Sequence, residues 1–348
     1  MVPSRTRIVL VGAGRRARQT ILPAIHACSD RVELVGVCTR SERELELLGG
    51  RFRTTTTSLE DIDLASVQTV VVAVGLSNVP HVVDLLARRG APGLTLMLDT
   101  PGLAPSDLRA AKLFPSFANV LASEDNYALP LFVLARRLLD EGAIGGLRHA
   151  HLAHSGYRHH AIAALKQLTG AAHPTRVAVH RWSSFSAELR IRFPGGVRAT
   201  IVEPRRYGSG RTMIVGDGGF IVDYAIDHPK AIQVGYRTEG PRYLGLSVDG
   251  EPVEETELDR AFVSRLSDVP LEDPSLMNQM KIRGFMELLG GLGDPGSRFR
   301  YPALDAIADD LTVRFAERMP FATPGRPSLV RTAGRLAAPF VRSSGDEG

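Results

Sequence analysis

Cysteine, tryptophan and lysine are scarce in this chain, which has two, one and four of them among 348 residues. Two cysteines, Cys28 and Cys38, are too few for a disulfide framework or a cysteine zinc site, so a reducing cytoplasm is the expected location. No apolar run approaches the roughly 18 residues that a membrane-spanning helix needs. Residues 1–7 lead directly into a strand pattern and carry no signal-peptide pattern. Disulfide-rich secreted proteins and membrane proteins are therefore not the expected classes.

Because lysine is scarce, arginine provides most of the positive charge. The chain has 38 arginines against 38 acidic residues, and its pI is about 9.3. These arginines are scattered, whereas a nucleic-acid-binding surface is normally a basic stripe or a known motif. Nucleic acid is therefore not an expected partner. The local exception is the basic segment 326–342, for which a surface-packed or poorly ordered terminus is expected.

The first third of the chain alternates short β-branched runs with longer helical patterns. Strands are predicted at residues 7–11, 32–38, 70–74, 94–98 and 119–122. Helices are predicted at residues 16–27, 41–48, 79–89, 105–114 and 129–141. This alternation predicts an α/β fold with a doubly wound parallel sheet, whose ligand lies beyond the carboxyl ends of the strands.

The pattern changes in the second half. Between residues 147 and 253 strands follow one another with glycine-rich turn signals, interrupted by one short helix at 160–168. This pattern predicts an open, mostly antiparallel sheet and an α+β domain. Two late helices, at 275–289 and 302–318, are expected to pack back on the body. The predicted domains are an α/β domain at 1–123, an α+β substrate and oligomerisation domain at 124–324, and a basic tail at 325–348.

A glycine motif follows the first predicted strand. Gly12, Gly14 and Ala17 have the spacing of the G-x-G-x-x-G/A dinucleotide fingerprint. Gly12 allows a tight turn, Gly14 lets a pyrophosphate approach the backbone, and Ala17 permits close packing of helix on strand. The phosphates would rest on the helix N-terminus, and Arg15 and Arg16 are expected to add positive charge there. Since the motif lies between a predicted strand and a predicted helix, residues 1–123 are predicted to form a Rossmann domain.

The end of the second predicted strand indicates which dinucleotide is preferred. NAD-binding domains usually carry Asp or Glu there for the ribose 2′-hydroxyl, whereas a 2′-phosphate is met by arginine. Here the strand ends in Thr39-Arg40-Ser41, and no acid occurs before Glu42. Arg40 is expected to face the phosphate, while Thr39 and Ser41 supply hydroxyl donors. The predicted cofactor is NADP(H), in preference to NAD(H).

With these motifs in view, the chain resembles the Gfo/Idh/MocA family of glucose–fructose oxidoreductase and inositol dehydrogenase relatives over about residues 5 to 320. The segments that carry the resemblance are residues 8–17, 32–37, 78–90, 98–101 and 142–146. The resemblance implies a Rossmann domain followed by an open-sheet domain, and an NAD(P)-dependent oxidoreductase. It also implies that further residues border the cofactor, namely Val74, His81, Asp99, Thr100 and Pro101.

The chain departs from this family at its catalytic residues. The family typically carries Glu-Lys-Pro after the fourth strand, and here those positions read Asp99-Thr100-Pro101. The catalytic lysine is thus missing, and no lysine precedes Lys112 to replace it. The family also places an Asp four residues before a His, whereas here Gly156 stands four residues before His160. Only the histidine remains, so an ordinary sugar or polyol dehydrogenase is not expected.

Five of the ten histidines lie between residues 149 and 160. His160, Tyr157 and His159 are expected to lie near the nicotinamide as proton donors, with Arg158 holding an anionic substrate group. Asn126 and Tyr127 are expected on the rim of the same site. The other three histidines are interpreted as ordinary strand residues, with one face shared by the first two: His149, His151 and His154.

A metal site is not expected, because the carboxylate or cysteine that usually completes three ligands is not near these histidines in the sequence. Three functions stay open. The first is an NADPH-dependent reductase of an imine or activated carbonyl, the second a non-redox NADP-binding regulator or scaffold, and the third a non-redox reaction on the same fold. A homo-oligomer formed through the second-domain sheet is expected, with the strand at 187–193 as a candidate element.

Overall fold

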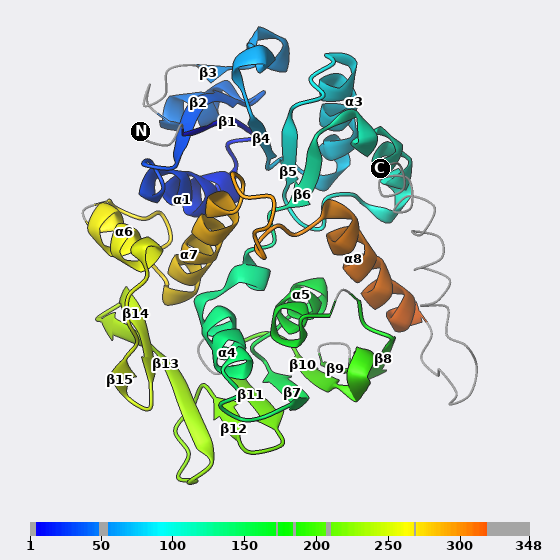
Figure 1. The fold of residues 1–348 in the computed structure, drawn as a ribbon. Helices are drawn as coiled ribbons and strands as arrows, with labels where there is room; N and C mark the ends of the chain where they lie inside the picture. The colour runs from blue at the N-terminus through cyan, green and yellow to red at the C-terminus, as the bar shows by residue number, and fades with distance from the viewer. Residues whose placement is uncertain are drawn as a thin grey trace. The chain divides into compact units, whose positions relative to one another are not determined.

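The structure is a computed structural model that describes residues 5–48, 55–171, 173–183, 186–206, 210–267 and 269–318. The chain divides into two compact units, each described by itself below (Figure 1). The first unit comprises Met1–Asp125 and Thr256–Ile307, and the second comprises Asn126–Glu255 and Ala308–Gly348. The predicted tail at 325–348 lies outside the described residues.

The first unit is built on a six-stranded parallel sheet with the strand order β3-β2-β1-β4-β5-β6. The order reverses beside β1, which pairs with β2 on one side and with β4 on the other. The predicted doubly wound sheet is therefore confirmed. Its strands are β1 (Thr6–Val11), β2 (Val32–Cys38), β3 (Thr55–Thr56), β4 (Thr69–Val72), β5 (Thr95–Leu98) and β6 (Asn119–Ala122).

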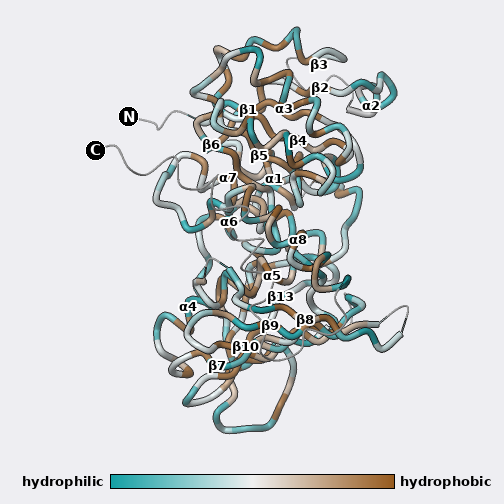
Figure 2. The backbone as a smooth tube through the Cα atoms, turned by 90° about the vertical axis from the view of Figure 1, so that its right-hand side faces the viewer, coloured by the Kyte–Doolittle hydropathy of each residue, from teal (hydrophilic) through white to brown (hydrophobic). Residues whose placement is uncertain are grey.

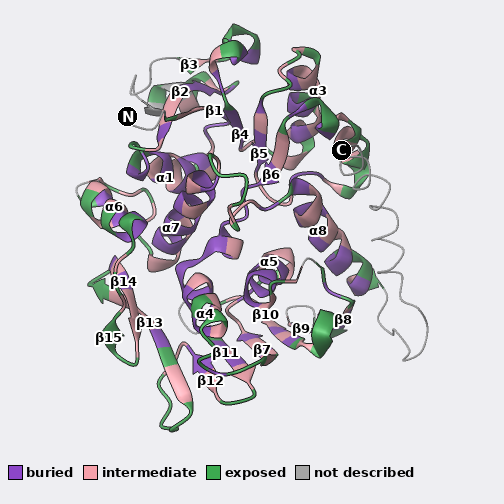
Figure 3. Cartoon of the chain, in the orientation of Figure 1, coloured by how far each residue is buried: buried purple, intermediate pink, exposed green. Residues whose placement is uncertain are grey.

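Continuous apolar runs bury this sheet on both faces, as parallel sheets require. β4 is buried along its whole length, and β1 is buried from Ile8 to Val11 (Figure 3). The central strands also carry the hydrophobic colours of the tube (Figure 2). Burial of these runs fixes the sheet, and with it the loops that leave the carboxyl ends of the strands.

Helices and single turns connect these strands. The first helix contains a π-helical segment, η1 (Ala17–Ile21), that continues as α1 (Leu22–Ala27). One predicted helix differs: residues Pro105–Ser116 form the 3-10 helix η5, in which Pro115 has no N–H to donate. The remaining helices of residues 5–125 are α2 (Glu42–Leu48), η2 (Leu59–Asp61), η3 (Leu64–Ser66), η4 (Leu76–Asn78) and α3 (Val79–Arg88).

A later stretch of chain, Thr256–Ile307, completes the first unit. It contains α6 (Glu257–Leu266) and α7 (Leu276–Gly290), and both helices contact α1. The two are tied together by Arg283 of α7, which is buried and donates to Asp259 of α6 at 2.8 Å. Sequence analysis predicted α7 as a late helix but missed α6, although Thr256-x-x-Asp259 forms a capping box at its start.

The second unit is built on a nine-stranded sheet with the order β15-β14-β13-β12-β11-β7-β10-β9-β8. Its pairs are antiparallel except for β7 with β10 and β12 with β13. The predicted open, mostly antiparallel sheet is confirmed. Its strands are β7 (Leu147–Ala153), β8 (Arg176–Arg181), β9 (Ala187–Arg192), β10 (Arg198–Glu203), β11 (Arg211–Gly216), β12 (Phe220–Val222), β13 (Ala231–Glu239), β14 (Arg242–Val248) and β15 (Glu251–Pro252).

The two faces of this sheet differ in burial. On β7, Ala150 and Leu152 are fully buried, whereas His149 and His151 alternate with them and are half-buried on the other face. Burial lowers the pKa of both histidines, and for His149 the neighbouring His151 adds to the effect. α4 (Pro130–Asp140) and α5 (Arg158–Thr169) contact the sheet. The remaining helices are η6 (Asp125–Ala128), η7 (Pro194–Gly196) and α8 (Ala303–Arg318). Among the described residues, no helix is long and apolar enough to cross a membrane.

Candidate functional site

The glycine loop of the first unit is shaped so that only glycine fits its first position. Gly12 has φ +101°, and a Cβ placed on it would lie 2.3 Å from the carbonyl oxygen of Ala73 and 3.2 Å from Val74 Cγ1. A side chain there is excluded both by the backbone conformation and by this contact. Gly14 differs, because a Cβ on it would meet only the Glu44 carboxylate, at 3.9 Å. The loop is therefore tight against β4 at Gly12 and open beside Gly14.

Backbone hydrogen bonds place this loop at the carboxyl ends of the strands. The Gly12 N–H donates to Cys38 O of β2 at 2.7 Å, and the Ala73 N–H donates to Val11 O of β1 at 2.8 Å. Ala17 is fully buried where the helix packs on the sheet, and Arg15 is exposed. This is the strand–turn–helix geometry in which a pyrophosphate approaches a helix N-terminus.

Arg16 points to the ends of β5 and β6. Its Nε lies 3.3 Å from Asp99 Oδ1, and its Nη1 donates to Asp125 Oδ2 at 2.9 Å. The Ser123 hydroxyl donates to the same Asp99 carboxylate at 2.8 Å. Burial by itself lowers the pKa of Arg16, but Asp125 and Asp99 outweigh it and raise that pKa above its ordinary value. The guanidinium is thus held between two carboxylates, an arrangement that sequence analysis missed although Ser-Glu-Asp follows the β6 pattern.

At the end of β2, Thr39 and Ser41 hold an acid from α2. The Thr39 hydroxyl donates to Glu44 Oε2 at 2.8 Å, and the Glu44 N–H donates to Ser41 Oγ at 3.2 Å. Arg40 is exposed and donates to Asn78 Oδ1 at 3.3 Å. Sequence analysis considered Glu42 as the next acid and missed Glu44. The signal was present, because Ser41-x-x-Glu44 has the spacing of a capping box.

The other residues expected at the cofactor also lie in the first unit. Thr100 and Pro101 directly follow Asp99 at the end of β5 and are half-buried, with a cis peptide bond between them. Val74 is half-buried just after β4, whereas His81 is exposed on α3. All but His81 follow the carboxyl end of a strand, where a doubly wound sheet binds its ligand.

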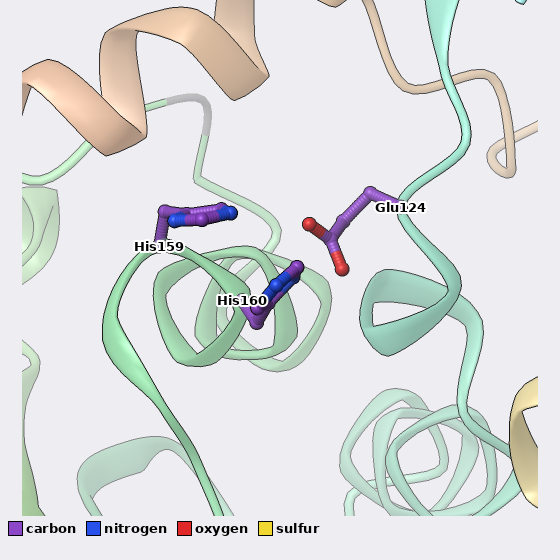
Figure 4. Close-up of side chains that lie close together, drawn as sticks. All are labelled: Glu124, His159 and His160. Carbon is purple, nitrogen blue, oxygen red and sulfur yellow. The ribbon is translucent and has the colours of Figure 1, made fainter. Parts of the chain in front are cut away.

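The histidines expected to be catalytic lie at the start of α5 in the second unit. The rings of His159 and His160 have centroids 4.1 Å apart, tilted by 40° (Figure 4). Both residues are half-buried, and His159 Nδ1 lies 3.4 Å from Asp310 Oδ1 of α8. Figure 4 also draws Glu124, a buried residue just after β6 in the first unit. Two imidazoles thus lie side by side at the start of α5.

Tyr157 and Arg158 form a second group at this helix start. Arg158 Nε donates to the Tyr157 hydroxyl at 2.6 Å, and its guanidinium also pairs with Glu317. The Arg158 N–H donates to Glu203 at 3.0 Å, and burial of Glu203 raises the pKa of that carboxyl although Arg158 opposes the shift. Tyr157 is 38% exposed. The Arg158 guanidinium is therefore already paired with the Glu317 carboxylate, and it also lies 5.1 Å from the centroid of the Tyr157 ring.

Asn126 and Tyr127 lie on η6, the single turn that leads into α4. Asn126 is buried and Tyr127 is half-buried. His154, expected to be an ordinary strand histidine, has its Nδ1 2.6 Å from the carbonyl oxygen of Pro204.

The fold has known counterparts, although neither a protein-family model nor a curated protein matches the sequence. An oxidoreductase from Agrobacterium radiobacter, solved with NAD+, L-tartaric acid and magnesium, is 13% identical with a TM-score of 0.63, over 93% of this chain and 98% of that one. The chain has the fold of this oxidoreductase. The WlbA dehydrogenase from Bordetella pertussis, solved with NADH and UDP-GlcNAcA, is 15% identical with a TM-score of 0.61 over 91% of this chain and 97% of that one. A myo-inositol dehydrogenase from Corynebacterium glutamicum is 13% identical with a TM-score of 0.61, over 90% of this chain and 96% of that one.

These similarities span both units, since each covers at least 90% of the chain. The two-part fold implied by the family resemblance is therefore confirmed. Identities of 13 to 15% mean that few side chains are shared, so the roles of individual residues rest on the geometry given above.

Proposed function

We propose that this chain is an NAD(P)-dependent oxidoreductase of the Gfo/Idh/MocA type with a non-standard active site. The observation that carries the proposal is the glycine loop, in which Gly12 leaves no room for a Cβ and Gly14 leaves an open approach at the carboxyl ends of β1 and β4. A dinucleotide fits such a loop, with its pyrophosphate on the helix that begins beside Arg15. Gly12, Gly14 and Ala17 would hold the cofactor there, together with Val74, Asp99, Thr100 and Pro101.

The substrate class we propose is an imine or carbonyl of a small metabolite, reduced with NADPH. When bound, the nicotinamide supplies the hydride. The chain must supply the proton, and its candidates are His160, Tyr157 and His159 at the start of α5. Thr100, at the position of the family lysine, is a neutral hydrogen-bond donor and no cationic acid. A C=N group is easily protonated, so an imine depends less on the missing lysine than an alcohol or ketone does.

The test is NADPH oxidation, followed by absorbance, with a panel of cyclic imines and activated carbonyls. Substrate-dependent consumption of NADPH supports the proposal. A second candidate, a catalytically silent NADP-binding regulator or scaffold, is favoured by the absence of the family lysine and aspartate at Thr100 and Gly156. Tight NADPH binding without turnover on the whole panel selects the regulator. Substrate conversion with only a catalytic amount of cofactor, without net change in NADPH, selects a non-redox reaction on the same fold.

The cytoplasmic location remains a prediction.

We expect NADP(H) to be preferred to NAD(H), because Arg40 is exposed at the end of β2 where a 2′-phosphate would lie. Arg40→Ala is expected to weaken NADPH binding by about tenfold to a hundredfold, the worth of a charge-assisted hydrogen bond, and NADH binding far less. The measurement is cofactor fluorescence titration. Arg43→Ala, which removes an exposed arginine from α2, is the matched control. Equal affinity of the unaltered chain for both cofactors contradicts the preference.

A homodimer through the second-unit sheet is expected, because that sheet has a half-buried face. Residues that alternate with the buried ones on β7 and β11 include His149, His151, Met213 and Val215, all half-buried. Light scattering should give twice the 37.7 kDa of the chain. Val215→Arg should shift this value toward the monomer by placing a charge in the interface, whereas Glu239→Arg at the exposed β13–β14 turn should not. A monomer at every concentration is the contrary result.

The strand expected at the interface is β9, whose two sides differ in burial. On β9, Ala187, Leu189 and Ile191 are buried within the unit, and Glu188, Arg190 and Arg192 alternate with them. Its apolar side is thus buried within the unit. Any partner would meet the polar side of β9.

A further inference from the structure

Glu44 lies two residues beyond Glu42, the acid that sequence analysis named after the second strand. It belongs to the first turn of α2, which is separated from the last residue of β2 by three residues. In a capping box, a glutamate at this position reaches back to the N–H of the capping residue. Here the Ser41 N–H is directed to Thr39 Oγ1 at 3.4 Å, and the Glu44 carboxylate accepts from Thr39 Oγ1 at 2.8 Å. The carboxylate is thereby turned toward the end of β2.

The same carboxylate faces the glycine loop. Its Oε1 lies 3.9 Å from the position of a Cβ on Gly14, while its Oε2 is the atom held by Thr39. The Gly12 N–H donates to Cys38 O at 2.7 Å, so the loop and the end of β2 are joined directly. In a dinucleotide-binding domain the adenosine ribose lies between these two segments, and an acid after the second strand accepts its 2′-hydroxyl.

We infer that Glu44 is the acceptor for the adenosine ribose hydroxyl and opposes the preference for NADP(H) that Arg40 creates. The inference rests on the proposed cofactor binding and makes Glu44 a specificity-determining residue. Its Oε1 is the oxygen that faces the open side of the loop, and a ribose 2′-hydroxyl would donate to it. Arg40, exposed on the same segment, is the group that a 2′-phosphate would meet.

The hydrogen bond from Thr39 to Glu44 affects the two cofactors differently. A threonine hydroxyl has one proton, and that of Thr39 is donated to Glu44. A 2′-phosphate would therefore find no free proton on Thr39, and it would also meet the negative charge of Glu44. A 2′-hydroxyl would leave the Thr39–Glu44 bond in place. With Arg40 on one side and Glu44 on the other, the subsite binds both dinucleotides, and the two residues set the ratio of their affinities.

The test compares Glu44→Gln with Glu46→Gln in the full chain. Glutamine keeps an acceptor for Thr39 and removes the charge, so α2 stays in place. Glu46 lies on the same helix and is exposed, so its replacement removes an equal charge away from the loop. Dissociation constants are measured for NADH, NADPH, adenosine 5′-monophosphate and adenosine 2′,5′-bisphosphate. The two adenosine nucleotides report on the subsite without any nicotinamide.

In Glu44→Gln we expect the ratio of NADPH to NADH affinity to rise by about tenfold or more. NADH loses a charge-assisted acceptor for its 2′-hydroxyl, and NADPH is freed from the repulsion between its 2′-phosphate and the carboxylate. The two adenosine nucleotides should show the same rise. In Glu46→Gln the ratio should stay within about twofold of its original value, because an exposed charge away from the ligand contributes little to binding. An unchanged ratio in Glu44→Gln, with both cofactors still bound, overturns the inference and leaves the proposed function intact. Failure of the unaltered chain to bind any of the four ligands overturns the proposed function itself.

Discussion

Arg16→Met is expected to destabilise the first unit by about 3 kcal/mol, the cost of removing a cation that pairs with a buried carboxylate. Asp125, whose side chain is only 3% exposed, accepts from Arg16 Nη1 at 2.9 Å, and Asp99 lies 3.3 Å from Arg16 Nε. Methionine approximates the length of the arginine stem, so the loss of stability measures the removed charge more than the removed packing. The measurement is the free energy of unfolding from denaturant titration.

The partner residue provides the control for this prediction. Asp125→Asn retains an oxygen that accepts from Arg16 but removes the buried charge. The double variant Arg16→Met/Asp125→Asn should therefore cost less than the sum of the two single variants, which is the signature of a direct pair in a double-mutant cycle. Arg15→Met, an exposed arginine on the same turn, should change stability by less than about 0.5 kcal/mol. Additive single effects would show that Arg16 and Asp125 do not interact.

His160→Ala and Tyr157→Phe are expected to carry the largest effects on turnover. A positioned general acid contributes typically ~10²–10⁴-fold, and we expect a loss of that size from whichever of the two donates the proton. His160 is half-buried at the start of α5, and the hydroxyl of Tyr157 accepts from Arg158 Nε at 2.6 Å, which leaves its proton for another acceptor. The measurement is the rate of NADPH oxidation with a substrate from the imine and carbonyl panel.

Thr100 separates this assignment from the family pattern. Thr100→Ala should reduce the rate by about tenfold at most, which is what one neutral hydrogen bond is worth. Thr100→Lys restores the family cation, and polyol oxidation gained by that change alone would identify the missing lysine as the main functional divergence. Full activity in both His160→Ala and Tyr157→Phe would mean that the acid lies elsewhere, with Tyr127 as the next candidate.

The sequence by itself determined the parallel sheet and the glycine loop, because both depend on residues close together in the chain. Continuous β-branched runs such as that of β4 can only be buried on both faces, so their positions were predicted to within a few residues. The role of Gly12 was likewise readable, since a positive φ at a tight turn demands glycine whatever surrounds it. The two strands 32–38 and 119–122 were predicted with the bounds that the structure has.

Only the tertiary structure decided which side chains meet. Arg16 was expected beside the phosphates, yet its guanidinium is held by two carboxylates that are 83 and 109 residues away in sequence. The acid near Gly14 comes from Glu44 on a helix, where no rule about the last residue of a strand would find it. The segment 256–307 joins the first unit because α6 and α7 pack on α1, far away in the chain. Strand and turn propensities act within a few residues, whereas ion pairs and helix packing depend on distances that folding alone sets.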